Sequence, residues 1–403
     1  MLNIVIWGAG KNCKFIIEAI NKDKCNLIGI VDMNQQLHQK YYLNKWLIDS
    51  PEKLINNRID FVIISAQNSI EILEECQKLG LEKERVIDYW NSNREYEFLD
   101  VNLKKILELE KRIKKLDRRL KNIPYELGIK SVPQIRPAKK LLEIIINDKK
   151  SLSRFGDGEL EIMQNRRRPW FQIVDERLAE RLKQVFSCKD EQIIIALADD
   201  FGNLEHYTEE AADEIRAYLD NGIREKVMNV IDMNRVYYDA YVTRPYLMYK
   251  DKSYASDIFQ LFKKVWENRD ILLVEGSQAC IGVRNDLFDS ASSIRRIIAP
   301  LKNAFSVYDE ILSLVRENIF ENILILISLG PTATVLAYDL AMEGIQALDI
   351  GQLDNEYEWY LRGAVKRIAI PGKHVAEIRQ FYEIETIEDI EYEKQIVAKI
   401  EMK

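Results

Sequence analysis

The sequence predicts an α/β protein with two Rossmann-like parallel-sheet domains joined by a short heptad-like helix. Three observations lead to this prediction. The 403 residues are too many for one ordinary hydrophobic core. Apolar strand-like runs alternate with helical patterns in two separate stretches, and a highly charged, heptad-patterned segment lies between them. We expect a first domain at 1–98, a helical connector and linker at 99–136, and a second domain at 137–403.

Composition limits the classes of protein to be considered. A content of 47% hydrophobic and 31% charged residues is typical of a soluble globular protein, and the net charge of -7 argues against nucleic acid as a partner. The five cysteines are widely spaced and contain no C-x-x-C pair, so a disulfide framework or zinc site is not indicated. We expect a cytoplasmic protein without a transmembrane segment, whose association with a membrane would be peripheral.

The first domain begins as a βαβ unit. The strand NIVIW leads into a glycine turn with Gly8 and Gly10, a helix over 14–22, and a second strand that ends at Asp32. This order is typical of a dinucleotide-binding turn, in which a helix N-terminus faces phosphate and an acidic residue binds a ribose. Cys13 stands where the third glycine belongs. A purely structural turn is therefore the favoured interpretation, and a bound nucleotide or sugar is the alternative.

A heptad-like helix is expected over 101–121. Its apolar residues recur at alternating spacings of three and four: Ile106, Leu109, Ile113, Leu116 and Leu120. Such a stripe buries a narrow seam, either against a neighbouring part of the chain or against its own copy in a homodimer. Both alternatives remain open, because isolated coiled coils this short are marginal. The proline-containing segment 122–137 is predicted to be the linker that follows.

In the second domain, continuous apolar runs such as IIIALA and ILILIS alternate with helices, which predicts a parallel sheet covered on both faces. Ligands of such sheets bind in the loops beyond the carboxyl ends of the strands. The first of these loops contains Asp157 and Glu159 in a D-x-E step. Two neighbouring carboxylates repel unless a cation neutralises them, so we expect them to bind Mn²⁺ or Mg²⁺ together with substrate phosphates. A helix N-terminus that favours acidic residues is the alternative.

Further residues are candidates for contacts with a diphosphate. Gly330 and Thr332 begin a helix after the strand ILILIS, where a bare backbone and a hydroxyl suit a phosphate. Gly156 opens the D-x-E loop, and Arg154 just before it is positioned to pair with a phosphate or with the nearby carboxylates. An ordinary capped helix start remains the alternative for Thr332.

Several segments together resemble the GT-D fold glycosyltransferases, a bacterial family first catalogued as a domain of unknown function. These segments run in order from 151 to 363 and include RFGDGE, DDFGNLE, VRNDLF, ISLGPTATVLAYDLA and ALDIGQLDNEYEWYLRG. The resemblance implies transfer of a sugar, typically glucose from UDP-glucose, to a growing bacterial glycan or glycoprotein glycan. It implies that the D-x-E carboxylates bind the metal. The residues that it places around the pocket are Asn285, Asp286, Asp349, Asp354 and Glu356.

The general base is not fixed by the sequence. Asp200, Asp354 and Glu356 are the candidates, because removing a proton from an acceptor hydroxyl needs a positioned carboxylate. Two other functions stay open beside a metal-dependent glycosyltransferase. One is an NAD(P)-dependent oxidoreductase that uses the first domain, and the other is a nucleotide-sugar-binding scaffold without catalysis.

Overall fold

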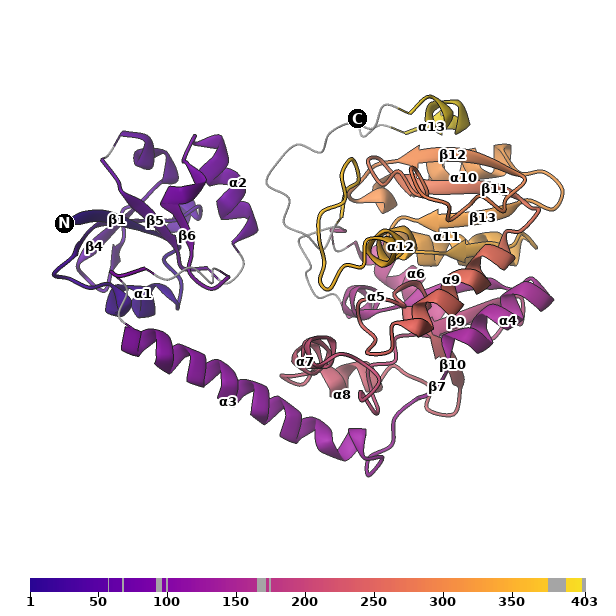
Figure 1. The fold of residues 1–403 in the computed structure, drawn as a ribbon, viewed down its shortest axis with the longest axis horizontal. Coiled ribbons are helices and arrows are strands. Elements are labelled where there is room, and N and C mark those ends of the chain that lie inside the picture. Colours follow the sequence, from indigo (N-terminus) through magenta and orange to yellow (C-terminus); the bar gives the residue numbers. More distant parts are fainter. Residues whose placement is uncertain are drawn as a thin grey trace. The chain divides into compact units, whose positions relative to one another are not determined.

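A computed structural model of the chain describes residues 1–56, 58–66, 69–91, 96–98, 101–164, 172–173, 175–375 and 389–400. The chain divides into two compact units, the first containing Met1–Leu116 and the second beginning at Asp117. Each unit is built on its own sheet (Figure 1).

The first sheet has six strands in the order β3-β4-β2-β1-β5-β6. Their bounds are β1 (Leu2–Trp7), β2 (Cys25–Val31), β3 (Tyr41–Tyr42), β4 (Trp46–Asp49), β5 (Phe61–Ile64) and β6 (Val86–Asp88). All neighbours are parallel except the hairpin of β3 and β4, which the sequence analysis did not predict. Helices α1 (Cys13–Ala19) and α2 (Ile70–Lys78) complete the unit. Ile4 and Ile6 of the central strand pack on one face, and Val5 and Trp7 on the other.

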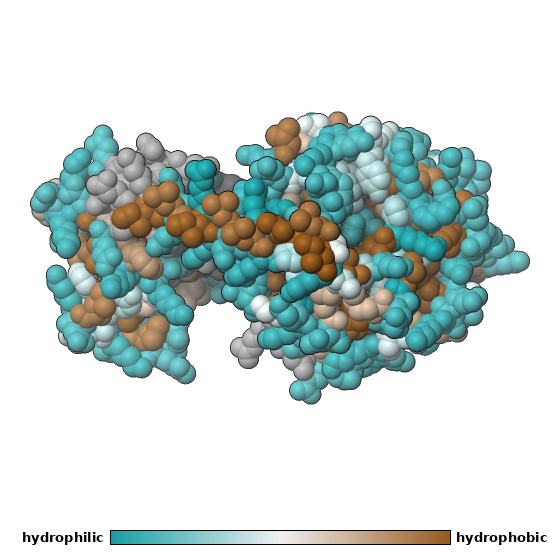
Figure 2. Space-filling view, turned by 90° about the horizontal axis from the view of Figure 1, so that it is seen from below, coloured by the Kyte–Doolittle hydropathy of each residue, from teal (hydrophilic) through white to brown (hydrophobic). Residues whose placement is uncertain are grey.

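Helix α3 (Val101–Glu126) crosses the division between the two units. The sequence predicts a linker from residue 122, but the helix continues past Pro124 to Glu126. A proline inside a helix removes one hydrogen bond. The last turn is held by a bidentate ion pair, because Arg216 donates to both carboxylate oxygens of Glu126 at 2.7 and 3.0 Å. Figure 2 shows an apolar stripe along α3.

The second sheet has nine strands, all parallel, in the order β15-β12-β11-β13-β14-β8-β9-β10-β7. Their bounds are β7 (Gln134–Arg136), β8 (Ser151–Phe155), β9 (Ile193–Leu197), β10 (Val236–Asp239), β11 (Asp270–Gly276), β12 (Ser293–Ala299), β13 (Leu324–Ser328), β14 (Ala347–Asp349) and β15 (Ile396–Lys399). The central strands are almost entirely buried, as expected for a sheet with helices on both faces.

The helices of the second unit form two layers (Figure 1). The layer on one face packs α5 (Asp157–Met163), α6 (Glu176–Ser187), α7 (Glu209–Tyr218), α10 (Tyr308–Glu317) and α11 (Pro331–Met342) into one core. The other face is covered by α4 (Ala138–Asp148), α9 (Ser253–Val265) and α12 (Leu353–Leu361). The short helix α8 (Ile223–Met228) packs into the same core as α5, whereas α13 (Ile390–Gln395) contributes Tyr392 to a separate small cluster. The predicted fold class is confirmed.

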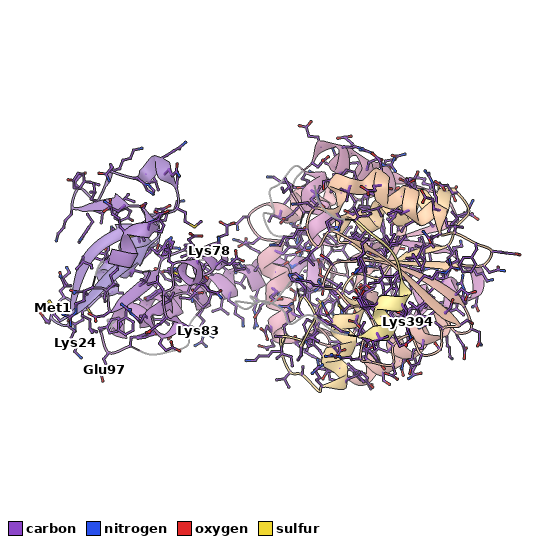
Figure 3. The ribbon with its side chains drawn as sticks, turned by 90° about the horizontal axis from the view of Figure 1, so that it is seen from above. Met1, Lys24, Lys78, Lys83, Glu97 and Lys394 are labelled. Carbon is purple, nitrogen blue, oxygen red and sulfur yellow. The ribbon has the colours of Figure 1, made fainter. Side chains whose placement is uncertain are left out.

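Charged side chains on the outside of both units point into solvent. Lys24, Lys78, Lys83 and Lys394 are examples (Figure 3). Within the described ranges, none of the helices is both long and apolar enough to cross a membrane. In contrast to these exposed lysines, some carboxylates are buried at the carboxyl ends of strands in the second sheet.

Candidate active site

The strand order of the second sheet changes direction at β8. From β8 the chain proceeds outward to β9 and β10, whereas β11, β13 and β14 lie on the opposite side of β8. Such a switch point opens a crevice at the carboxyl ends of the strands, where α/β proteins bind ligands. Four acidic residues end or follow the strands around it: Asp157 after β8, Asp200 after β9, Asp239 at the end of β10, and Asp349 at the end of β14.

The D-x-E step forms the first turn of α5. Glu159 Oε2 accepts a hydrogen bond from the Gly156 N–H at 2.9 Å, and Asp157 Oδ1 accepts one from the Gly158 N–H at 2.8 Å. The carboxylates therefore cap the helix, which is the structural alternative that the sequence left open. Burial, followed by the nearby charge of Asp349, raises the pKa of the Glu159 carboxyl. A nearby cation would stabilise the ionised form of this Glu159 carboxyl.

Arg154 pairs with Asp349 across the switch point. Its Nη2 lies 2.7 Å from Asp349 Oδ1, and its Nε donates to the Asp349 carbonyl oxygen at 2.9 Å. Burial raises the pKa of the Asp349 carboxyl, although the Arg154 charge acts in the opposite direction. Thr334 of α11 donates its hydroxyl to the Arg154 carbonyl oxygen at 3.0 Å. These contacts join the ends of β8 and β14 to α11.

Gly351 lets the Arg154 side chain reach its partner. Its φ of +43° lies in the left-handed region, and a Cβ built there would approach Arg154 Nη2 to 2.0 Å. A side chain at this position would displace the guanidinium, so the turn after β14 requires glycine.

A buried acidic cluster lies beside Asp157. Burial, with further contributions from the charges of Asp157 and Asp239, raises the pKa of Asp200 to about 7. Burial also raises the pKa of Asp199 and of Asp239, even though Asp239 accepts hydrogen bonds from the Tyr241 N–H and the Tyr249 hydroxyl. Asp200 Oδ1 is buried and has no hydrogen-bond partner within the part of the chain that is described.

Asp239 and Asp199 were not predicted as site residues. Asp239 stands in the tyrosine-rich stretch VYYDAYV, where it reads as one polar residue on a half-buried surface. Its position at the carboxyl end of β10, next to β9, is the signal that identifies it, and that signal needs the strand order.

The N-terminus of α11 meets the site where the sequence predicts a phosphate contact. Gly330 has a φ of +56°, and Pro331 follows as the first helical residue. Thr332 is fully buried, and its Oγ1 has no hydrogen-bond partner among the residues that the structure describes. A helix of this length presents free N–H groups and a partial positive charge at its start, which favours an anion.

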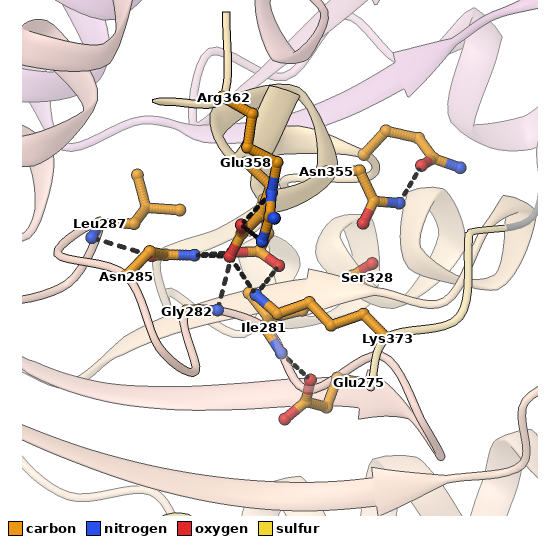
Figure 4. Close-up of polar contacts among 12 residues, drawn as sticks. Glu275, Ile281, Gly282, Asn285, Leu287, Ser328, Asn355, Glu358, Arg362 and Lys373 are labelled. Atoms are coloured by element: carbon orange, nitrogen blue, oxygen red, sulfur yellow. Dashed lines mark hydrogen bonds and ion pairs between the residues drawn. The ribbon is translucent and has the colours of Figure 1, made fainter. Parts of the chain in front are cut away.

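Other predicted residues form a separate network (Figure 4). Lys373 Nζ donates to Asp354 Oδ2 at 2.7 Å and to Glu358 Oε1 at 3.0 Å. Asn285 Nδ2 bridges the same two carboxylates, at 2.8 Å from each. Lys373, Asp354 and Glu358 are almost completely buried, so the network holds α12 to the loops around it. Neither Lys373 nor Glu358 was predicted from the sequence.

Two further candidates are engaged elsewhere. Buried Glu356 accepts hydrogen bonds from the N–H groups of Tyr246 and Leu247, both at 3.0 Å. Asp286 lies at the surface, where it contacts Lys263 Nζ and the Tyr357 hydroxyl, both at 2.6 Å. The structure therefore brings together Arg154, Asp157, Glu159, Asp200 and Asp349, but not Asp286.

The donor set at the switch point fits a hard divalent cation only in part. Within the described ranges, no group of three or more His, Cys, Asp or Glu residues is arranged to hold a metal. Mn²⁺ or Mg²⁺ is commonly bound by one or two carboxylates, with substrate phosphates and water completing the shell. The unpartnered Asp200 Oδ1 beside Asp157 fits this arrangement.

In the first unit, Asp32 supports the glycine turn. Its Oδ2 accepts a hydrogen bond from the Ala9 N–H at 2.7 Å, and its Oδ1 accepts one from the Asn34 N–H at 2.8 Å. Cys13 is buried at the place of the third glycine. Both observations agree with the structural interpretation of this turn.

All the site residues of the second unit, from Arg154 to Lys373, fall within one matched region. Residues 152–378 match the family model described as glycosyltransferase GT-D fold. The chain belongs to the GT-D glycosyltransferase family. Residues 1–87 match a separate model, described as C2185-like, N-terminal. The family resemblance predicted from the sequence motifs is confirmed.

Two curated relatives carry glycosyltransferase names. The probable glycosyl transferase Gly of Streptococcus gordonii is 39% identical over 262 residues, which are 64% of this chain and 38% of Gly. Glycosyltransferase GlyD of Streptococcus pneumoniae serotype 4 is 38% identical over 268 residues, which are 66% of this chain and 32% of GlyD. The chain thus spans only about a third of the length of these relatives.

Solved structures of the GT-D family resemble the second part of the chain. One, described as showing that the highly conserved domain of unknown function 1792 has a distinct glycosyltransferase fold, shares 39% identity at a TM-score of 0.63 and covers 67% of this chain and 96% of its own. Another, described as a new glycosyltransferase from Streptococcus sanguinis, shares 37% identity at a TM-score of 0.63 and covers 67% of this chain and 100% of its own.

Proposed function

We propose that the second unit transfers a glucosyl group from UDP-glucose to a hydroxyl of a bacterial surface glycan or glycoprotein glycan. Membership of the GT-D family supports the reaction class, and the sequence resemblance supports the donor. The observation that carries the proposal is the group of carboxylates at the carboxyl ends of three adjacent strands, the partly exposed Asp157 and the buried Asp200 and Asp239, where the pKa of Asp200 is raised to about 7.

Asp157 and Glu159 are the proposed ligands of Mn²⁺ or Mg²⁺, with Asp200 nearby. When bound, the ion neutralises negative charge on the donor diphosphate and on the UDP that departs. The helix cap formed by Glu159 fixes the first turn of α5, so the two carboxylates are presented in a defined geometry before the donor binds.

The start of α11 is the proposed diphosphate cradle. Gly330 exposes backbone, the Thr332 hydroxyl is buried without a partner among the described residues, and the helix dipole favours negative charge. The Arg154–Asp349 pair holds β8 against β14 beside this cradle, and Gly156 donates its N–H to Glu159 at the start of α5. The bond between the anomeric carbon and the diphosphate oxygen breaks here, and its electron pair leaves with UDP.

Asp200 is the proposed general base. Its buried carboxyl follows β9 beside Asp157, and in its ionised form it would accept the proton of an acceptor hydroxyl while the new glycosidic bond forms. Asp354 and Glu356 are already bound by Lys373, Asn285 and backbone N–H groups. We assign them to holding the loops and α12 around the pocket, together with Asn285. A nucleotide-sugar donor and free, mostly buried cysteines favour a cytoplasmic location.

A donor screen tests this proposal. The purified chain is incubated with UDP-glucose, UDP-galactose, UDP-N-acetylglucosamine or GDP-mannose in Mn²⁺, Mg²⁺ or EDTA, and release of the nucleoside diphosphate is measured. We expect fastest release from UDP-glucose and a requirement for a divalent ion. Equal release in EDTA would remove the metal from the mechanism. Tight binding of the donor without turnover would instead favour a nucleotide-sugar-binding scaffold.

A further inference from the structure

Helix α3 carries an exposed apolar seam. Six of its residues recur at spacings of three and four, and their side chains are between 41% and 66% exposed: Ile106, Leu109, Ile113, Leu116, Leu120 and Ile123. The stripe is continuous in Figure 2. Large apolar side chains exposed in such a regular row mark an interaction surface. The residues that the structure describes leave these side chains exposed, so intrachain packing, one of the two alternatives left by the sequence, does not cover them within that part of the chain.

Other residues of the second unit bind the C-terminal part of α3, at one border of the seam through Arg119 and on the face away from the seam through Arg118 and Asn122. Arg118 pairs with Asp220 at 3.0 Å, and Arg119 pairs with Asp213 at 3.1 Å. Asn122 contacts buried Arg224. These residues lie between the seam positions along the helix, so the contacts fix the C-terminal half of α3 while the seam stays exposed.

We propose that α3 pairs in parallel, and in register, with α3 of a second copy of this chain. The spacing assigns the seam to heptad positions, with Ile106, Ile113 and Leu120 at a and with Leu109, Leu116 and Ile123 at d. In its first two heptads, isoleucine stands at a and leucine at d, and this combination favours parallel two-stranded coiled coils.

The charges beside the seam specify the parallel orientation. Arg112 and Arg119 occupy g positions, whereas Glu110 and Asp117 occupy e positions. Parallel helices place each g residue next to the following e residue of the partner helix, so Arg112 meets Asp117 of the second copy. Antiparallel helices would place arginine beside arginine and carboxylate beside carboxylate. Arg119 would face Pro124, and it already has a partner in Asp213 of its own chain.

The same charges disfavour a lipid surface as the occupant of the seam. A helix that lies on an anionic membrane is rich in lysine or arginine along both borders of its apolar face. On α3, one border carries Glu110 and Asp117 instead. A second copy of α3 would pair the basic border of one helix with the acidic border of the other, so we propose a second copy as the partner.

Sedimentation analysis of the full chain tests the pairing. A seam of about three heptads is short, so we expect reversible association in the micromolar range. The mass should rise from 47.3 kDa towards twice that value as the concentration increases. Ile113→Lys should stay monomeric with an unchanged circular dichroism spectrum, because Ile113 is exposed in the single chain. Lys114→Gln, one residue off the seam, should associate like the wild type.

Charge reversals test the orientation. In parallel helices, Arg112→Glu places a carboxylate next to Asp117 of the second copy, and the repulsion should weaken association several-fold. Asp117→Arg should weaken it similarly, because it places a guanidinium next to Arg112. The double variant restores opposite charges and should recover most of the wild-type affinity. In antiparallel helices, Arg112→Glu alone would relieve repulsion and tighten the dimer.

Two results would overturn the pairing itself. One is a wild-type chain whose mass stays at 47.3 kDa throughout the micromolar range. If that chain also sediments with phosphatidylglycerol vesicles, a lipid surface and not a second copy binds the seam. The other is a dimer that persists in Ile113→Lys. Tightening by Arg112→Glu would overturn the parallel orientation. None of these measurements depends on the proposed transferase activity.

Discussion

Arg154 and Asp349 form an ion pair at the point where the strand order of the second sheet reverses, with 2.7 Å between Nη2 and Oδ1. Their side chains are 15% and 3% exposed, so the pair is largely withdrawn from water. It connects β8, which carries Asp157 after its end, to β14. The stability and the chemistry of the site therefore depend on the same contact.

Loss of the guanidinium should destabilise the second unit. Arg154→Met keeps the length of the side chain but leaves the buried Asp349 carboxylate unpaired, and such losses cost about 3 kcal/mol or more. Arg177→Met is the matched control, because its pair with Asp309 is 59% and 74% exposed and is worth less than about 1 kcal/mol. Urea unfolding of both variants measures the difference. Equal small losses would mean that the Arg154–Asp349 pair is effectively solvated.

A methyl group at Gly351 should also destabilise the second unit, through backbone strain and a clash with Arg154. Gly351→Ala combines left-handed strain of about 1 kcal/mol with a clash against Arg154. Gly344→Ala is the control, because its φ of +80° carries similar strain but nothing lies within 4 Å of its Cβ. We expect Gly351→Ala to lower both Tm and UDP release, and Gly344→Ala to lower only Tm, slightly. Indistinguishable variants would contradict the close approach.

The raised pKa of Asp200 predicts how stability depends on pH. A carboxyl with a pKa of about 7 in the folded state and about 4 in the unfolded state binds its proton more tightly when folded. The contribution of Asp200 to the free energy of unfolding is therefore fully present below about pH 4 and is lost as the pH rises through about 7. In EDTA, the stability of Asp200→Asn relative to wild type should therefore grow between pH 5 and 8, by at most about 3 kcal/mol.

Chemical unfolding of the two proteins across that range checks the prediction. Mn²⁺ should reduce the difference at pH 8, because a bound cation favours the ionised carboxylate. A difference that is independent of pH would show that Asp200 titrates normally in the folded protein.

The second unit should act without the first. The GT-D family model matches residues 152–378, and the solved relatives match 67% of this chain over 96% and 100% of their own lengths, so their chains contain little beyond the matched region. Deletion of residues 1–98 should therefore leave UDP release within about twofold of the full chain. The experiment needs a folded product, shown by a cooperative thermal transition. A folded but inactive product would place a part of the site in the first unit.

Much of this arrangement follows from local sequence. Runs such as IIIAL and LILIS are buried strands of a parallel sheet, and chemistry at their carboxyl ends follows from that class of fold. Asp157 and Asp200 were therefore both predicted as site residues without the structure. The heptad stripe was also visible, although Pro124 led to a prediction that the helix ends too early.

The remaining features depend on contacts between distant parts of the chain. The pairing of β14 with β8 brings Asp349 onto Arg154, a partner 195 residues away. Lys373 neutralises Asp354 from a loop without a motif, so the sequence alone left Asp354 as a candidate for catalysis. Glu356 was a candidate for the same reason, until its backbone partners were known.

The most direct test of the account is metal-dependent UDP release from UDP-glucose by three variants that each remove one carboxylate. Asp157→Asn and Asp200→Asn change the switch point, whereas Asp286→Asn changes a predicted residue that lies at the surface beside Lys263. We expect the first two to lower kcat by at least about 100-fold with unchanged folding, and Asp286→Asn to remain within about twofold of wild type. Full activity of Asp157→Asn and Asp200→Asn, with loss in Asp286→Asn, would place the active site elsewhere.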